Sequence, residues 1–447
     1  MNKKLLFQHK LGYALGDLGG CITFGIMGSF LLPYYTEVVG ITAASVGTLF
    51  FVAKIWDAVN NLLMGAILDK RYEKVQDQRG KFRPYILLGA PLVAITAVSI
   101  FGVPAEICMN GKLVWVYVTY ITYGMCYTFL TVPYGSLFSA MAITADEKAS
   151  LSSARSIGGL LGSLLPLMLF PGIISVMSDK PRTAYFLGIS IMAVMGLIFH
   201  LLCYKYTEER TVQFPKTNTQ VQMTDILAVV KRNRAFVGIS IIACAIIFTQ
   251  TIINTLSVYY FRDNLKAFTM IGIAKGAVML FSLVALTITP KVVKKNDTEK
   301  TVKACIIIGI IISAALFLFS DNLWLYIIFH SIGMMFLSIP AFMQWGMLGD
   351  VIDYNEYLMN KRSEGAIFGS FNFCRRIGQA AGASLGAFAI GIIGYIPNAA
   401  VQPESVLRGI RIISLGAPVF GGIIIFITFK FIWNINDELR KKITVKK

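Results

Sequence analysis

AKIWDAVNNLLMGAILDKRYEKVQDQRGKFRPY, residues Ala53–Tyr85, is the stretch that decides the fold, because it joins an apolar run containing polar residues to a basic loop. The run from Ala43 to Leu68 is long and apolar enough to cross a bilayer, which needs about 20 residues. Its middle carries Asp57, Asn60 and Asn61 at i, i+3 and i+4, which places all three side chains on one face of a helix. An aspartate at the centre of a membrane helix costs about 2.5 to 3.5 kcal/mol on insertion, so this face is expected to look into the protein.

The composition is typical of a polytopic membrane protein. Of the 447 residues, 56% are hydrophobic and 15% are charged, and the mean hydropathy is +0.66, whereas soluble proteins carry about 25% charged residues. The formal net charge is +17, but the Lys and Arg residues stand between apolar runs, where they set topology rather than bind nucleic acid. The cysteines fall mostly in or beside apolar runs, so no disulfide framework or thiolate metal site is expected. The first apolar run is too long for a cleavable signal and is expected to be retained.

Twelve apolar runs are long enough to be membrane-spanning helices. They are Leu11–Leu32, Ala43–Leu68, Tyr85–Pro104, Val114–Ala140, Leu151–Val176, Ala184–Tyr204, Phe236–Tyr259, Phe268–Pro290, Val302–Phe319, Leu323–Trp345, Ile367–Ile393 and Ile410–Trp433. The connecting segments alternate in basicity: the one after the first run has no Lys or Arg, and the one after the second is rich in both. By the positive-inside rule, both termini of this multi-pass chain are expected in the cytoplasm, in a plasma (cell inner) membrane.

The longest polar segment, Lys205 to Arg234, divides the chain into two halves. We predict an N-terminal six-helix half (1–204), a cytoplasmic central loop (205–235), a C-terminal six-helix half (236–434) and a basic cytoplasmic tail (435–447). A short internal repeat supports this division, because Arg155-Ser-Ile-Gly158 opens the fifth run and Arg375-Arg-Ile-Gly378 stands at the matching place in the eleventh. The predicted fold class is an all-α membrane protein, and the layout resembles the major facilitator fold, which binds its solute near the midplane between the halves.

Asp57 is the strongest candidate for function, because a cation coupled to transport needs a buried carboxylate that takes a proton or supplies oxygen ligands. The alternative is a structural ion pair with Lys54 or with an arginine of another helix. Thr128 and Thr131 in the fourth run can supply hydroxyl oxygens to the same cavity, although such residues often hydrogen-bond within their own membrane helix.

A second carboxylate, Asp17, lies in the first run among glycines that permit close approach of a helix or a ligand. Its alternative role is an ion pair with Lys10 or with an arginine. Arg155 and Arg376 are cations in or near the membrane that must find carboxylates or a polar ligand. Pairing with Asp17 or Asp57 and contact with a solute are both open at this level.

Other motifs indicate packing rather than chemistry. The turn Arg79-Gly-Lys-Phe-Arg-Pro84 is suited to latch neighbouring helix ends through salt bridges and a helix-terminus dipole. His200 and His330 stand alone in apolar runs and are expected to be satisfied core residues. The sequence has no G-x-x-x-x-G-K-[ST] nucleotide loop, no nucleophile with a base in context and no metal-ligand cluster, so neither an ATP-driven pump nor an enzyme is expected.

Seven motifs together resemble the glycoside-pentoside-hexuronide:cation symporter family, the melibiose-carrier branch of the major facilitator superfamily. They are Gly16-Asp17, Pro33-Tyr-Tyr-Thr-Glu-Val-Val-Gly40, Lys54-Ile-Trp-Asp-Ala-Val-Asn60, Arg79-Gly-Lys-Phe-Arg-Pro84, Val132-Pro-Tyr-Gly135, Asp350-Val-Ile-Asp-Tyr354 and Arg376-Ile-Gly-Gln379. The resemblance covers nearly the whole chain. It implies uptake of a sugar or glycoside by alternating access, driven by co-transported Na⁺ or H⁺ and without any cofactor.

The resemblance also implies roles for individual residues. Asp57, Asn60 and Thr128 match the cation site of the family, with Na⁺ or H⁺ at Asp57. Asp17, Arg155 and Arg376 fall at or near its sugar pathway, and Arg376 stands where the family usually has a lysine. The full predicted site is Asp57, Asn60, Asn61 and Thr128 for the cation, and Asp17, Cys21, Tyr127, Thr131, Arg155 and Arg376 for the solute.

Three positions depart from melibiose carriers, which have aspartates where this chain has Cys21, Asn61 and Thr131. The first and last of those aspartates serve the sugar, so we expect a substrate other than a melibiose-like galactoside. Asn61 replaces a cation-site carboxylate; its amide oxygen can ligate a cation, but it cannot accept a proton or neutralise Na⁺. Two alternatives therefore stay open: an uncoupled sugar facilitator, and a lipid-type solute carrier on the same fold. The expected partners are one small sugar or glycoside and the lipid bilayer, with a monomer as the expected state.

Overall fold

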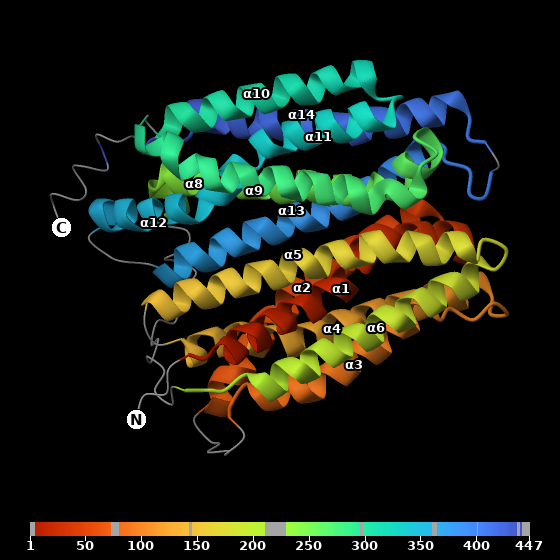
Figure 1. Cartoon of the computed structure of the whole chain (residues 1–447), viewed down its shortest axis with the longest axis horizontal. Helices are drawn as coiled ribbons and strands as arrows, with labels where there is room; N and C mark the ends of the chain where they lie inside the picture. Colours follow the sequence, from red (N-terminus) through yellow and green to blue (C-terminus); the bar gives the residue numbers. More distant parts are fainter. Residues whose placement is uncertain are drawn as a thin grey trace. The chain divides into compact units, whose positions relative to one another are not determined.

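The structure is a computed structural model that describes residues 5–72, 80–142, 145–210, 229–295, 298–359, 364–399, 401–435 and 439. Within these ranges the regular secondary structure is helical, and Figure 1 shows long rods joined by short connections. Helices satisfy every backbone N–H and C=O within one segment, which is what a chain crossing lipid requires.

The described residues separate into two compact units. The first contains α1 (Phe7–Pro33), the π-helical turn η1 (Tyr34–Val39), α2 (Ala43–Tyr72), α3 (Arg83–Phe101), α4 (Met109–Met141), α5 (Ala145–Val176) and α6 (Pro181–Tyr206). In this unit α1 packs on α5 and α6, α3 lies beside α4 and α6, and α2 lies against α4.

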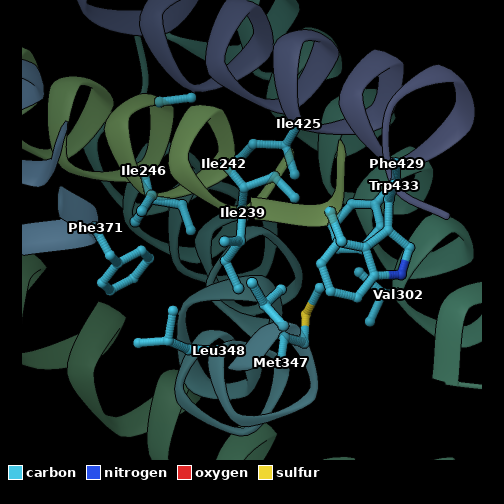
Figure 2. Close-up of a cluster of buried hydrophobic side chains, with 14 of the residues drawn as sticks. Ile239, Ile242, Ile246, Val302, Met347, Leu348, Phe371, Ile425, Phe429 and Trp433 are labelled. Atoms are coloured by element: carbon cyan, nitrogen blue, oxygen red, sulfur yellow. The ribbon is translucent and has the colours of Figure 1, made fainter. Parts of the chain in front are cut away.

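The second unit is built from another set of long helices. These are α8 (Arg234–Tyr259) with the π-helical turn η2 (Tyr260–Asn264), α9 (Ile271–Lys295), α10 (Thr298–Phe319), α11 (Leu323–Leu337), α12 (Ile339–Met359), α13 (Glu364–Ile392) and α14 (Glu404–Phe431). The 3₁₀ turn η3 (Phe268–Met270) precedes α9, and residues 269–272 are grouped with the first unit. Figure 2 shows its apolar core, where Ile239 and Ile242 of α8 meet Met347 of α12 and Phe429 of α14. The bounds expected for the central loop (205–235) and the tail (435–447) remain predictions, because much of both segments lies outside the described residues.

Ten helical segments of the described chain are long and apolar enough to span a membrane. α2 and α13 are not among these segments, and both carry polar residues in their middles: Asp57, Asn60 and Asn61 in α2, and Arg375 and Arg376 in α13. The exact number of twelve spans therefore stays a prediction, whereas the all-helical fold is observed.

One predicted span is divided in two. The run Leu323–Trp345 forms α11 and α12, which meet at Ser338. Pro340 is the second residue of α12, where the N–H that proline lacks would have no intrahelical partner.

Glycines explain the close pairing of α1 with α5 and of α8 with α13. A Cβ on Gly158 would overlap the carbonyl oxygen of Ala14, and a Cβ on Gly378 would overlap that of Cys244. These two glycines close the repeated Arg-x-Ile-Gly motifs, so the repeat has the same packing role in each unit. Larger side chains at either position would push the paired helices apart.

The segment after α6 binds the start of α3. The Glu209 carboxylate accepts backbone N–H bonds from Lys81, Phe82 and Arg83, at 2.8, 2.7 and 3.0 Å. These N–H groups stand at the start of a helix, at the positive end of its dipole, where a carboxylate is stabilising. The latch predicted for Arg79–Pro84 thus has a helix-terminus contact in its described part, while Arg79 itself lies outside the described residues.

Candidate functional site

Asp57 lies in α2 and forms an ion pair within its own helix. Lys54 Nζ stands 3.2 Å from Asp57 Oδ2, with the two side chains 13% and 20% exposed. The spacing of three residues puts both groups on the same face of α2, and Lys54 also lies over the Phe24 ring of α1 at 5.4 Å. The structural alternative considered for Asp57, a pair with Lys54, is therefore present in this structure.

The face of α4 next to the Asp57 carboxylate carries a glycine, Gly124, in place of a larger side chain. A side chain on Gly124 would collide with Asp57 Oδ1, so glycine is what lets the carboxylate sit against α4. Thr128 is one turn further along the same face and is buried, at 4% exposed. The structure thus places the Asp57 carboxylate of α2 against α4 at Gly124, one helical turn from Thr128.

The two asparagines beside Asp57, Asn60 and Asn61, differ in their hydrogen bonding. Asn61 donates its amide N–H to the Asp57 backbone carbonyl, so this donor is spent within α2. The Asn60 amide nitrogen is buried with no hydrogen-bond partner in the structure. An unpaired buried donor costs about 1 to 3 kcal/mol, which a bound polar group can recover.

A second polar cluster joins α1 to α5. Arg155 Nε donates to Asp17 Oδ1 at 3.1 Å, and Cys21 Sγ lies 4.0 Å from Asp17 Oδ2. A Cβ on Gly159 would crowd the same carboxylate. Arg155 also lies over the Tyr134 ring, at 5.5 Å. Of the partners left open by the sequence, Arg155 therefore uses Asp17.

An aromatic row lies between the two clusters. The Phe24 ring, which carries Lys54 on its face, stacks on Tyr127 of α4 at 5.6 Å, and Tyr127 stacks on Tyr123 at 5.8 Å. The Tyr123 hydroxyl donates to Thr23 Oγ1 at 3.2 Å, which ties α4 to α1. Flat rings beside hydroxyls, an amide and a carboxylate are the contacts that a sugar ring takes, because its C–H face packs on aromatics and its hydroxyls donate and accept.

The structure gives two other predicted residues their own surroundings. The Thr131 hydroxyl donates to the Tyr127 carbonyl of its own helix at 2.8 Å, so this donor is used within α4. Arg376 is an exposed residue of α13, in the second unit.

The sequence prediction missed Phe24, Tyr123 and Gly124. Gly124 and Tyr123 stand one turn before Thr128 and Tyr127, so extending the α4 face by one turn would have found them. Phe24 carries no signal in the sequence, because an aromatic residue in an apolar run is ordinary.

His200 is only partly satisfied. Its Nδ1 lies 2.7 Å from the Gly196 carbonyl, while its buried Nε2 has no partner in the structure.

The arrangement suits binding and not covalent chemistry. Among the described residues, no group of three or more His, Cys, Asp or Glu side chains could hold a metal ion. A cation at Asp57 would therefore rely on one carboxylate with amide and hydroxyl oxygens, and would compete with the Lys54 ammonium for that carboxylate. Together the candidate spans and this polar cluster define a multi-pass membrane protein with charged groups among its helices.

The chain belongs to the MFS/sugar transport protein family, whose model it matches over residues 12–437. It is 30% identical over 443 residues to the uncharacterized symporter YjmB of Bacillus subtilis (strain 168), covering 99% of this chain and 95% of that protein. It is 28% identical over 455 residues to the glucuronide carrier protein homolog of Escherichia coli (strain K12), covering 100% of this chain and 96% of that one. The inward-open xylose transporter XylE from E. coli has the same fold, with a TM-score of 0.64 at 12% identity over 97% of this chain and 98% of that chain.

These likenesses confirm two predictions. The chain is a glycoside-pentoside-hexuronide symporter-type member of the major facilitator superfamily, and its fold is the major facilitator fold.

Proposed function

We propose that this protein is a secondary active transporter that symports a sugar or glycoside with Na⁺ or H⁺ by alternating access. The family and the glucuronide carrier homolog support a sugar-type solute. The observation that carries the coupling is the Asp57 carboxylate, which sits in a membrane helix beside the buried, unpaired Asn60 amide. Asp57 would bind the coupling cation together with Asn60, Asn61 and Thr128.

Lys54 gives this mechanism a defined exchange step. Without a coupling ion, the Lys54 ammonium neutralises Asp57 and rests on the Phe24 ring. A proton or Na⁺ that binds Asp57 releases Lys54, and the released ammonium changes the polar environment beside Phe24 and Tyr127. The charge of Asp57 is neutralised in two forms of the protein, one with a bound ion and one paired with Lys54. The two forms favour different conformational states, so ion binding shifts the balance between these states.

The solute would bind along the aromatic row. Tyr127 and Phe24 offer ring faces, Asn60 offers an amide, and the Asp17–Arg155 pair offers an acceptor and a donor for hydroxyl groups. Cys21 and Arg376 complete the proposed pathway, whereas the Thr131 hydroxyl is used within α4. The proposed location is the plasma membrane with both termini in the cytoplasm, because the basic segments alternate along the sequence.

A second candidate, an uncoupled facilitator, is favoured by the same ion pair. If Lys54 stays on Asp57 throughout the transport cycle, the buried carboxylate is already neutralised and no external cation is needed. Asp57→Asn separates the two functions, because a facilitator does not need the carboxylate to take up an ion.

The test is uptake of labelled glycosides, pentosides and uronides into proteoliposomes with a Na⁺ gradient, a H⁺ gradient or neither. For a symporter we expect wild-type accumulation with one gradient, and equilibration without accumulation in Asp57→Asn. Equilibration that needs no gradient and is unchanged in Asp57→Asn would refute coupling and support the facilitator.

A further inference from the structure

A small cavity lies wholly within the second unit, where α8, η2, α9, α11 and α14 meet. It leaves about 10 Å³ for the centres of water molecules, which is room for one water-sized group. Its polar lining comes from Ser257, Tyr260, Lys275, Tyr326, His330 and Ser414. Among the described residues that line it there is no carboxylate.

The positive charge in this cavity has no countercharge nearby. Lys275 stands one turn after the start of α9, inside an apolar span, and its ammonium donates to Asn254 Oδ1 at 2.8 Å. Among the described residues no carboxylate lies within 4 Å of it. Asp263, in the η2 turn that also lines the cavity, pairs with Arg262 at 3.0 Å. An ammonium has three N–H donors, so Lys275 can bind a further acceptor.

Ser414 of α14 gives an independent indication of a ligand. Ser414 lines the cavity and is 8% exposed, and its buried hydroxyl has no hydrogen-bond partner in the structure. Two neighbouring hydroxyls are engaged, because Ser257 donates to the Asn254 carbonyl at 2.7 Å and Tyr260 to the Ser320 carbonyl at 3.3 Å.

His330 is buried, as predicted, and forms one wall of the cavity. It is 7% exposed and stacks on the Tyr326 ring at 5.1 Å with an angle of 9° between the rings. The cavity therefore combines a fixed aromatic wall, an ammonium and an unpaired hydroxyl.

We propose that this cavity binds a small monoanionic group between Lys275 and Ser414, either the carboxylate of an acidic sugar or a halide ion. An ammonium without a countercharge is costly in a membrane span, and an anion offsets that cost through charge-assisted hydrogen bonds. The room for one water-sized group suits a halide or a single carboxylate oxygen. The carboxylate form rests on the proposed function and would make an acidic sugar the substrate, whereas the halide form does not depend on it.

The test uses the full-length protein in detergent, in a halide-free methanesulfonate buffer. Binding of glucuronate and of glucose is measured by calorimetry, and binding of bromide by its stabilisation against thermal unfolding. The variants are Lys275→Gln, Lys275→Arg and Ser414→Ala. Lys112→Gln is the matched control, because Lys112 also donates to a neutral oxygen, the Val39 carbonyl at 3.3 Å, but lies in the first unit.

We expect Lys275→Gln to weaken the anion about 10- to 100-fold, the usual range for a hydrogen bond to a charged group, and to leave glucose binding unchanged. Ser414→Ala should weaken the anion by a smaller factor, and Lys275→Arg should retain binding. Loss of glucuronate binding alone assigns the site to the substrate carboxylate, and loss of bromide binding alone assigns it to a free halide.

Three results would overturn the proposal: no binding of either anion to the wild type, anion affinities that do not depend on Lys275, or equal losses for glucose and glucuronate. If Lys275→Gln does not fold, Ser414→Ala and Lys275→Arg decide in its place. If the wild type binds no sugar, the proposed function fails, and bromide still tests the cavity.

Discussion

Replacing Lys54 with glutamine tests whether this lysine competes with the coupling ion. At 3.2 Å and an effective dielectric constant of about 20, the attraction between Lys54 and Asp57 is about 5 kcal/mol before desolvation is subtracted. An incoming ion must replace that interaction, while the released lysine regains part of the energy by hydration. If the net free energy needed to displace Lys54 from Asp57 is about 1.5 to 3 kcal/mol, Lys54→Gln should lower the half-saturating concentration of the coupling ion about 10- to 100-fold.

The assay is solute uptake into proteoliposomes as a function of Na⁺ or H⁺ concentration. Lys54→Arg keeps the charge and should behave much like the wild type. The double variant Lys54→Gln with Asp57→Asn should show no ion dependence, because the carboxylate is gone. A folded Lys54→Gln protein with the wild-type half-saturating concentration would refute the exchange step, and would leave Lys54–Asp57 as a structural pair.

Three further substitutions test the packing and the assignment of individual residues. Gly158→Ala forces a Cβ onto the Ala14 carbonyl and should destabilise the first unit by about 1 to 3 kcal/mol, whereas Gly172→Ala on the same helix meets nothing within 4 Å; equal thermal stability of the two variants would contradict this packing. Glu209→Gln keeps the shape of the side chain but removes the charge of the carboxylate that accepts three backbone N–H bonds, so the melting temperature should fall by a few degrees. An unchanged melting temperature would show that these bonds contribute little to stability. Thr131→Val removes a hydroxyl bonded only within its helix, so uptake kinetics should change less than about 2-fold; a loss of solute affinity above about 10-fold would instead show direct contact with the solute.

Interactions within one helix could be derived from the sequence. Lipid forces the chain into helices, and a helix repeats every 3.6 residues, so Asp57, Asn60 and Asn61 had to share a face and Lys54 had to be within reach of Asp57. The same logic applies to Lys275, a charge in an apolar span, and would have marked it as a candidate alongside Asp57.

Interactions between helices needed the tertiary structure, because they depend on how far each helix is rotated and shifted against its neighbour. The sequence left Arg155 with Asp17, Asp57 or a solute as partners, and the packing of α1 on α5 around Gly158 selected Asp17. The contact of Phe24 with Lys54 and the cavity at Lys275 likewise join residues of different helices, to which sequence spacing assigns no common face. The sequence by itself thus determined the membrane helices and the polar face of α2, while tertiary packing decided which charges pair and where a ligand has room.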